Sequence, residues 1–120
     1  MKPRYKKKNE ELEALIAQLK KASIENKVNL WKRVALDLEK PTRNRRIINV
    51  YKIAKYSKEN DVVVVPGKVL GEGELNHKIN VAAYTFSDEA LKKINGKGKA
   101  MSLLELVKTN PKGKNVKILG

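Results

Sequence analysis

The chain has 120 residues, of which 27 are lysine or arginine and 13 are aspartate or glutamate, so its formal net charge is +14 at pH 7. Such an excess of like charge opposes compaction unless a partner neutralises it, and nucleic acids and anionic membranes are the commonest partners. No apolar run approaches the roughly 18 residues of a membrane-spanning helix. The absence of cysteine excludes disulfides, thiol nucleophiles and thiolate zinc sites. Composition therefore indicates a nucleic-acid partner and no membrane.

The amino terminus lacks a secretory pattern, because Asn9 and Glu10 follow the first basic residues where an apolar segment would begin. We therefore expect a cytoplasmic protein. Residues 1–8 form a basic RNA-binding arm that we expect to be disordered in the free protein. Residues 9–120 form one domain, and at this length we expect a single, modest, mostly aliphatic core.

Two amphipathic helices are predicted at the start of this domain. Residues 10–22 carry leucine and isoleucine at i, i+3, i+4 and i+7, which places them on one helical face, and Asn9 is in position to cap this helix. Residues 30–39 form a second helix, whose apolar stripe includes Trp31 as an expected core residue. Pro41 disfavours helical geometry in the preceding residue and ends this element.

The middle of the chain is predicted to mix strands with a short helix. Residues 47–50 are interpreted as a short strand or irregular entry that leads into the helix. The valine run 62–65 is typical of a strand covered on both faces. We expect Pro66-Gly67 to end this strand in a turn before residues 68–70 resume it. A second strand is predicted at residues 78–86.

The last third of the chain is predicted to hold two helices and a strand. Ser87 caps a helix that runs to Asn95, where the Asn-Gly pair is a stop signal. Ser102 opens a capping box for the next helix. Residues 110–113 form a turn, and residues 116–119 close the chain as a strand. This order predicts a small α/β domain, with two N-terminal helices packed against alternating short strands and helices.

Enzymatic chemistry has little support in the sequence. His77 is the only histidine, and with Glu72 and Glu74 it could form an acid/base pair that cleaves RNA. A loop histidine with a local hydrogen bond is the simpler interpretation. The glycines within residues 67–73 match neither the Walker nor the dinucleotide pattern, so turns explain them better. We predict no catalytic residue, no cofactor, no metal site and no small-molecule substrate.

Positive charge is concentrated in stretches that contain no acidic residue. Residues 40–58 hold seven lysines and arginines and no carboxylate, and apolar residues that can pack are interleaved with them. Because the basic stretches are separate, contact on several sides is expected, which favours structured RNA over one groove of duplex DNA. Tyr5, Tyr51 and Tyr56 lie in these stretches and serve either packing or base stacking.

This pattern yields a set of predicted RNA contacts. Arginines can grip phosphate with a bidentate fork, which lysine cannot do. The predicted contacts are Lys2, Arg4, Tyr5, Lys6, Lys7 and Lys8 in the arm, Arg33, Lys40, Arg43, Arg45, Arg46, Lys52 and Lys55 on the main folded surface, and Lys68, Lys112 and Lys114 as secondary contacts.

The segment from Val62 to Gly73 resembles the valine-rich, proline-glycine-lysine segment of the archaeal and eukaryotic large-subunit ribosomal protein family L-eighteen-e, a relative of bacterial L-fifteen. Further stretches look like that family in the same order along nearly the whole chain. They are Trp31 to Ala35, Lys40 to Arg43, Asn49 to Ile53, Val81 to Ala83, Phe86-Ser87 with Ala90, and Asn110 to Gly113 with Val116, Ile118 and Gly120. The short length looks archaeal. The chain departs from the resemblance at Asn95 to Gly98, where adjacent glycines are expected.

The resemblance implies a structural constituent of the large ribosomal subunit, without catalytic residues, in an α/β fold shared with the bacterial relative. The implied partners are large-subunit ribosomal RNA and neighbouring ribosomal proteins, and the implied location is the large subunit in the cytoplasm. Two alternatives remain open from the residues. One is a chromatin-type DNA-compacting protein, which the same net charge supports, and the other is an RNA-cleaving enzyme that acts through His77.

Overall fold

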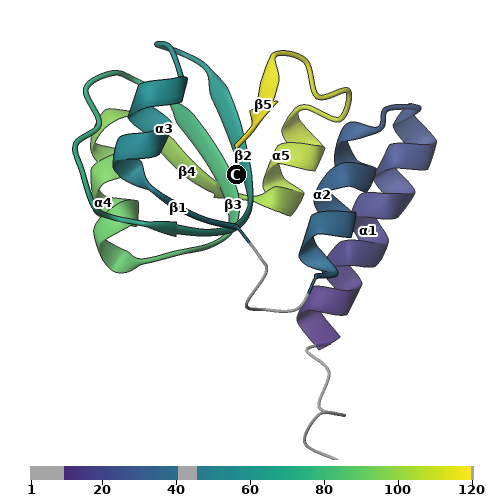
Figure 1. Ribbon diagram of the computed structural model, residues 1–120. Coiled ribbons are helices and arrows are strands. Elements are labelled where there is room, and N and C mark those ends of the chain that lie inside the picture. Colours follow the sequence, from purple (N-terminus) through teal and green to yellow (C-terminus); the bar gives the residue numbers. More distant parts are fainter. Residues whose placement is uncertain (1–9, 41–45, 120) are drawn as a thin grey trace, which may run out of the picture.

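The computed structural model describes residues 10–40 and 46–119, and for Arg46 only the backbone. Helices and strands alternate over most of this length (Figure 1). The elements are α1 Glu10–Asn26, α2 Leu30–Leu38, β1 Arg46–Asn49, α3 Val50–Tyr56, β2 Val62–Leu70, β3 Asn80–Phe86, α4 Asp88–Lys97, β4 Lys99–Ser102, α5 Leu103–Thr109 and β5 Val116–Ile118.

The strands form one parallel sheet in the order β1-β2-β3-β4. β5 and β1 share the same edge of β2, one after the other. β5 pairs with the first residues of β2, from Val62 to Val64, and β1 pairs with the last, from Gly67 to Leu70. The long strand β2 therefore organises the sheet, because three other strands pair with it.

Helices cover both faces of this sheet, as parallel strands require. α3 and α4 lie on one face, and α1, α2 and α5 lie on the other (Figure 1). The predicted α/β class and the packing of the two N-terminal helices are confirmed. The single core was a wrong expectation, because a separate hydrophobic cluster fills each face.

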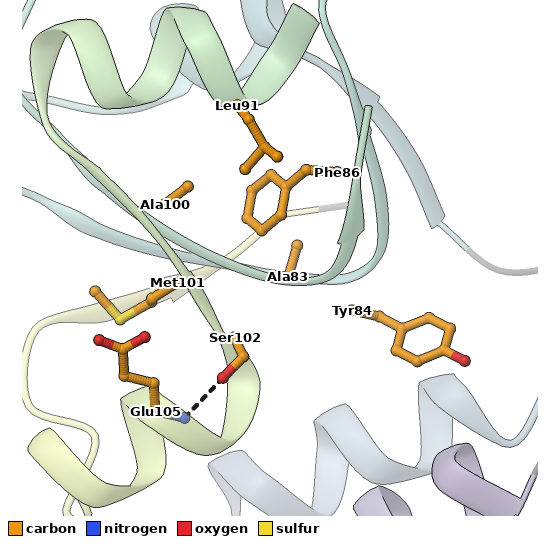
Figure 2. A pocket seen from close by; sticks show the side chains of 8 residues that line it. All are labelled: Ala83, Tyr84, Phe86, Leu91, Ala100, Met101, Ser102 and Glu105. Carbon is orange, nitrogen blue, oxygen red and sulfur yellow. Dashed lines mark hydrogen bonds between the residues drawn. The ribbon is translucent and has the colours of Figure 1, made fainter. Parts of the chain in front are cut away.

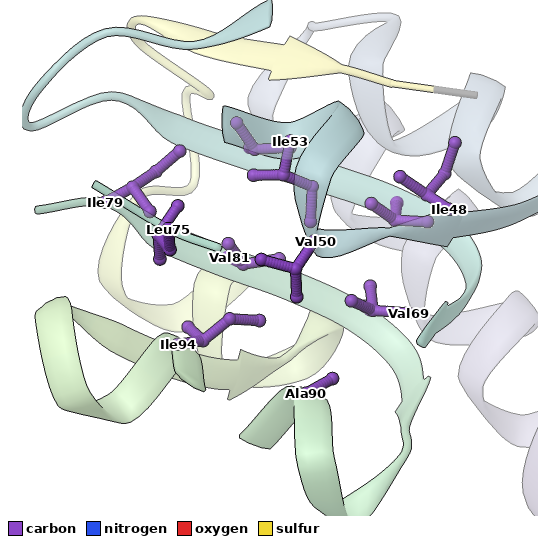
Figure 3. Close-up of a cluster of buried hydrophobic side chains, with 12 residues drawn as sticks. Ile48, Val50, Ile53, Val69, Leu75, Ile79, Val81, Ala90 and Ile94 are labelled. Atoms are coloured by element: carbon purple, nitrogen blue, oxygen red, sulfur yellow. The ribbon is translucent and has the colours of Figure 1, made fainter. Parts of the chain in front are cut away.

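The valine run of β2 shows why two clusters form. Val63 and Val65 pack with α3 and α4, whereas Val64, between them, packs with α1 and α2. All three valines are fully buried. The first cluster also receives Val50 and Ile53 from α3 (Figure 3). The prediction of a strand covered on both faces is confirmed.

Pro66-Gly67 does not end the strand, which corrects the predicted turn. β2 runs through this pair, and its register with β3 shifts between Val65 and Lys68. A bulge of this kind leaves one residue unpaired, and proline is tolerated there because it has no amide hydrogen to donate. The segment 68–70 is thus the second half of one strand.

The helix after Ser87 also differs from its prediction at its end. α4 passes through Asn95-Gly96 to Lys97, and Gly98 follows as the C-cap. A Cβ atom at Gly98 would lie 1.8 Å from the carbonyl oxygen of Ile79, so only glycine fits there. β4 begins at the next residue and was missing from the prediction.

Both predicted serine caps are confirmed. The Ser87 hydroxyl accepts a hydrogen bond from the Ala90 amide at 3.2 Å, and the Ser102 hydroxyl accepts one from the Glu105 amide at 3.1 Å. The first helix is longer than predicted and ends at Asn26. Its proposed cap, Asn9, lies outside the described residues.

Candidate nucleic-acid interface

The structure describes part of the predicted RNA-contact set. Arg33, Lys40, Lys52, Lys55, Lys68, Lys112 and Lys114 have described side chains, all of them exposed. Arg46 begins β1, and only its backbone is described. The contacts predicted at Lys2, Arg4, Tyr5, Lys6, Lys7, Lys8, Arg43 and Arg45 lie outside the described residues.

Lys52 and Lys55 project from the same side of α3. Val50 and Ile53 of this helix point into the hydrophobic cluster beneath it (Figure 3), so the two lysines lie on the opposite, outward side. Neither lysine pairs with a carboxylate in the described part of the chain. Their ammonium groups are therefore available to phosphate.

Arg33 and Lys40 belong to the other face of the sheet, on and just after α2. Arg33 is exposed and has no carboxylate partner among the described residues. The Lys40 ammonium lies 3.2 Å from the carboxylate of Asp37, three residues earlier. The expected single folded surface is therefore divided, because α2 and α3 flank opposite faces of the sheet.

Lys68 lies in the second half of β2, between β1 and β3. Its register partners are Ile47 in β1 and Thr85 in β3, and all three side chains are exposed. Residues in register on adjacent strands point to the same face of a sheet. Lys68 therefore stands in an open row across the sheet, beside the strand that Arg46 begins.

Lys112 and Lys114 lie in the loop before β5, which packs against the turn between α1 and α2. The Trp31 indole donates a hydrogen bond to the Pro111 carbonyl at 2.8 Å, and the Lys112 ammonium donates one to the Asn26 carbonyl at 3.2 Å. Trp31 itself is fully buried, as predicted. The loop brings Lys112 next to Lys27, a basic residue that the predicted set did not include.

Several lysines outside the predicted set are occupied by internal contacts. The ammonium groups of Lys20, Lys99 and Lys117 lie 2.7 to 3.0 Å from carboxylates of Glu39, Glu105 and Asp61. The amide of Lys58 and the ammonium of Lys117 donate to the Asp61 carboxylate, and these hydrogen bonds lower the pKa of Asp61 below its usual value. Net charge alone overstates the positive charge that is free to meet a partner.

The hypothesis of catalysis at His77 gains no geometric support. Its Nε2 atom lies 2.9 Å from the Ser57 hydroxyl, which in turn donates to the Ile53 carbonyl. This local hydrogen bond matches the simpler interpretation of the residue. No three histidine or acidic side chains in the described ranges gather closely enough to hold a metal ion.

A pocket of about 260 Å³ lies beside β3 and β4 (Figure 2). Phe86, Leu91 and Met101 make most of its lining apolar, and Ser102 and Glu105 stand at its margin. The Ser102 hydroxyl caps α5, and the Glu105 carboxylate pairs with a lysine at 2.9 Å. These two polar groups are engaged in the fold. Among the described helices, none is both long and apolar enough to cross a membrane.

Comparison with known proteins identifies the family. Residues 10–102 match the model of a family of ribosomal proteins that comprises 50S-L15, 50S-L18e and their 60S counterpart. Proteins named large ribosomal subunit protein eL18 are similar over most of the chain. The one from Methanothermobacter thermautotrophicus is 45% identical over 114 residues, and the one from Methanoregula boonei is 43% identical over 114 residues; in both cases 94% of each chain is covered.

A further relative of the same name, from Sulfurisphaera tokodaii, is 53% identical over 91 residues, which are 75% of this chain and 77% of the relative. All three relatives come from archaea. The resemblance read from the valine-rich segment is confirmed, and the chromatin-type alternative is not supported. The chain belongs to the family of ribosomal proteins 50S-L15 and 50S-L18e.

Proposed function

We propose that this protein is a structural constituent of the large ribosomal subunit, where it binds ribosomal RNA and holds its tertiary structure in place. The observation that carries the proposal is its similarity, over nearly the full length of both chains, to proteins named for that subunit. The exposed, unpaired lysines on α3 and β2 support an electrostatic mode of binding. The role is structural, without chemistry on a substrate.

The mechanism rests on phosphate neutralisation from two sides of a thin domain. Lys52 and Lys55 serve one face, and Arg33 with Lys40 serves the other. Phosphate contacts fix position and register rather than sequence, so specificity comes from the shape of the folded RNA. The arm at residues 1–8 and the arginines at 43 and 45 extend these surfaces in the proposal.

The cellular test is sedimentation of a lysate through a high-salt gradient, with detection of the protein in each fraction. Co-migration with the large ribosomal subunit at high salt is expected of an integral component. Migration at the top of the gradient, or with DNA, would overturn the proposal.

A matched pair of variants tests the electrostatic mechanism. The first replaces the exposed, unpaired Lys52, Lys55 and Lys68 with glutamine, and the second replaces the internally paired Lys20, Lys99 and Lys117. Each variant loses three positive charges. For the first, the slope of log affinity for RNA against log salt should become less negative by roughly 2 to 3. An equal change in the second variant would show that net charge, rather than these surfaces, governs binding.

A further inference from the structure

We propose that the outward side of α3 is a binding site for an unpaired nucleotide of RNA, whose base stacks on tyrosine while its phosphates contact lysine. The inference rests on the proposed RNA-binding function and names the class of RNA feature that this helix takes. The site consists of Tyr51, Lys52, Lys55 and Tyr56, which we call the α3 stacking face.

Helical spacing places these four side chains together. Val50 and Ile53 are fully buried beneath α3 (Figure 3), so the remaining residues of the face point away from the core. Residues four apart are neighbours on a helix surface. Each tyrosine therefore has a lysine at its side, Tyr51 beside Lys55 and Tyr56 beside Lys52.

Both tyrosine rings are exposed to an extent that packing does not explain. Tyr51 is 53% exposed and Tyr56 is 51% exposed, in a chain whose one tryptophan is fully buried. Neither hydroxyl has a hydrogen-bond partner in the described part of the protein. The ammonium of Lys55 lies 5.4 Å from the centre of the Tyr56 ring. The rings thus offer open π surfaces with positive charge next to them.

The start of this helix is held rigidly from below. The Tyr51 amide donates a hydrogen bond to the Glu72 carbonyl at 2.9 Å. Gly73, with φ of +105°, lies so close that a Cβ atom there would be 2.4 Å from the Cβ of Tyr51. The Lys93 ammonium fixes the same loop by donating to the carbonyls of Gly71 and Gly73 at 2.7 and 2.6 Å.

This support lowers the entropy that binding must remove from the platform. The loop also brings one acidic residue, Glu72, to the Tyr51 end of the face. Phosphate is therefore favoured toward Lys52 and Lys55 and disfavoured beyond Tyr51. The arrangement gives the bound strand a preferred place for its base and another for its backbone.

The ligand must present an accessible base, because paired bases in an RNA duplex are covered by their stacked neighbours. Unpaired bases in loops and bulges are recognised by stacking on aromatic side chains, with little dependence on which base is present. Alternating tyrosine and lysine without a nearby pocket suits that contact. A bulged or looped nucleotide is thus the ligand that this chemistry favours.

The test compares two RNA hairpins that differ only by one bulged 2-aminopurine nucleotide, using the full-length protein at one salt concentration. The wild-type protein should bind the bulged hairpin about tenfold more tightly than the fully paired one, and the 2-aminopurine fluorescence should fall on binding. Replacement of Tyr51 and Tyr56 with leucine should remove this preference and leave affinity for the paired hairpin unchanged. Replacement of both with phenylalanine should keep it.

Thermal unfolding of the leucine variant checks that the fold is intact, which is expected because both rings are exposed. Equal binding of the two hairpins by the wild-type protein, or a phenylalanine variant as weak as the leucine variant, would overturn the stacking site. In that case a steep salt dependence for both hairpins would leave the proposed RNA binding standing. Failure to bind either hairpin at low salt would overturn both.

Discussion

Two glycines that lie two residues apart, Gly96 and Gly98, are expected to respond in opposite ways to the same substitution. They belong to the segment that departs from the adjacent glycines of its resemblance. A Cβ atom at Gly96 would meet no atom within 4 Å, and this residue lies inside α4. A Cβ atom at Gly98 would lie 1.8 Å from the carbonyl oxygen of Ile79 and 2.7 Å from its carbonyl carbon.

The size of each effect follows from these contacts. Alanine in place of glycine inside a helix stabilises by about 0.5 to 1 kcal/mol, so Gly96→Ala should raise the free energy of unfolding. For Gly98→Ala, a normal carbon–oxygen approach of about 3.3 Å requires the two backbones to separate by about 1.5 Å. The Ile79 carbonyl accepts the Lys99 amide at 3.2 Å, the contact that starts β4 beside β3. Loss of that bond plus overpacking should cost about 3 kcal/mol or more.

Urea unfolding followed by the fluorescence of Trp31 measures both effects. Trp31 is fully buried on the opposite face of the sheet, so it reports unfolding of the domain rather than a local change at Gly98. The expected order of the free energy of unfolding is Gly96→Ala, wild type, Gly98→Ala. A Gly98→Ala variant within about 0.5 kcal/mol of wild type would refute the steric argument, because surface substitutions commonly fall in that range.

Two further substitutions test contacts that hold the fold. Asp61→Asn should lower the thermal midpoint at neutral pH, because the pKa of the Asp61 carboxyl is lowered in the folded state by hydrogen bonds from a backbone amide and a lysine. A lowered pKa stabilises the fold above the unfolded value of about 3.9 and loses its effect as the pH falls through the folded value, so wild type and variant should converge in acid; a constant difference down to pH 2 would contradict this. Lys93→Met keeps the apolar stem but removes the donor to the carbonyls of Gly71 and Gly73, and urea unfolding should show a loss of about 1 to 3 kcal/mol. The exposed Lys92→Met is the control and should change stability by less than about 0.5 kcal/mol; equal losses in both would refute the structural role of Lys93.

The elements that sequence reasoning found are those whose signal is local. The leucine spacing of α1, the valine run of β2 and the serine caps of α4 and α5 each depend on residues within a few positions. Burial and capping geometry then follow from the periodicity of the helix or strand. These features could be predicted because the same residues that form the element also display its pattern.

The elements that sequence reasoning missed depend on neighbours far away in the chain. β4 is only Lys99–Ser102, with no clear alternation, and it forms because the free edge of β3 supplies backbone partners. β2 continues through Pro66-Gly67 because β1 pairs with one side and a shifted register with β3 absorbs the extra residue. Turn chemistry was outweighed there by tertiary pairing, which no local window contains.

The candidate site was predictable in sign but not in arrangement. Lys92 and Lys93 are indistinguishable in the sequence, yet Lys92 is exposed and Lys93 holds the Gly71–Gly73 loop. A count of positive charges gives the field around a protein, whereas the free charges at a surface depend on which ammonium groups the fold has already engaged. That division becomes visible only when the carboxylates and carbonyls have positions.

The two-faced sheet has a consequence for how the proposed partner is held. Because β2 is buried on both sides, helices must flank both faces, and the basic residues of α2 and α3 are forced apart even though little more than a dozen residues separate them in sequence. One RNA duplex lying on α3 would leave Arg33 without a phosphate. A partner that satisfies both faces must therefore approach from two directions, which a folded RNA with separate helices does and a single straight duplex does not.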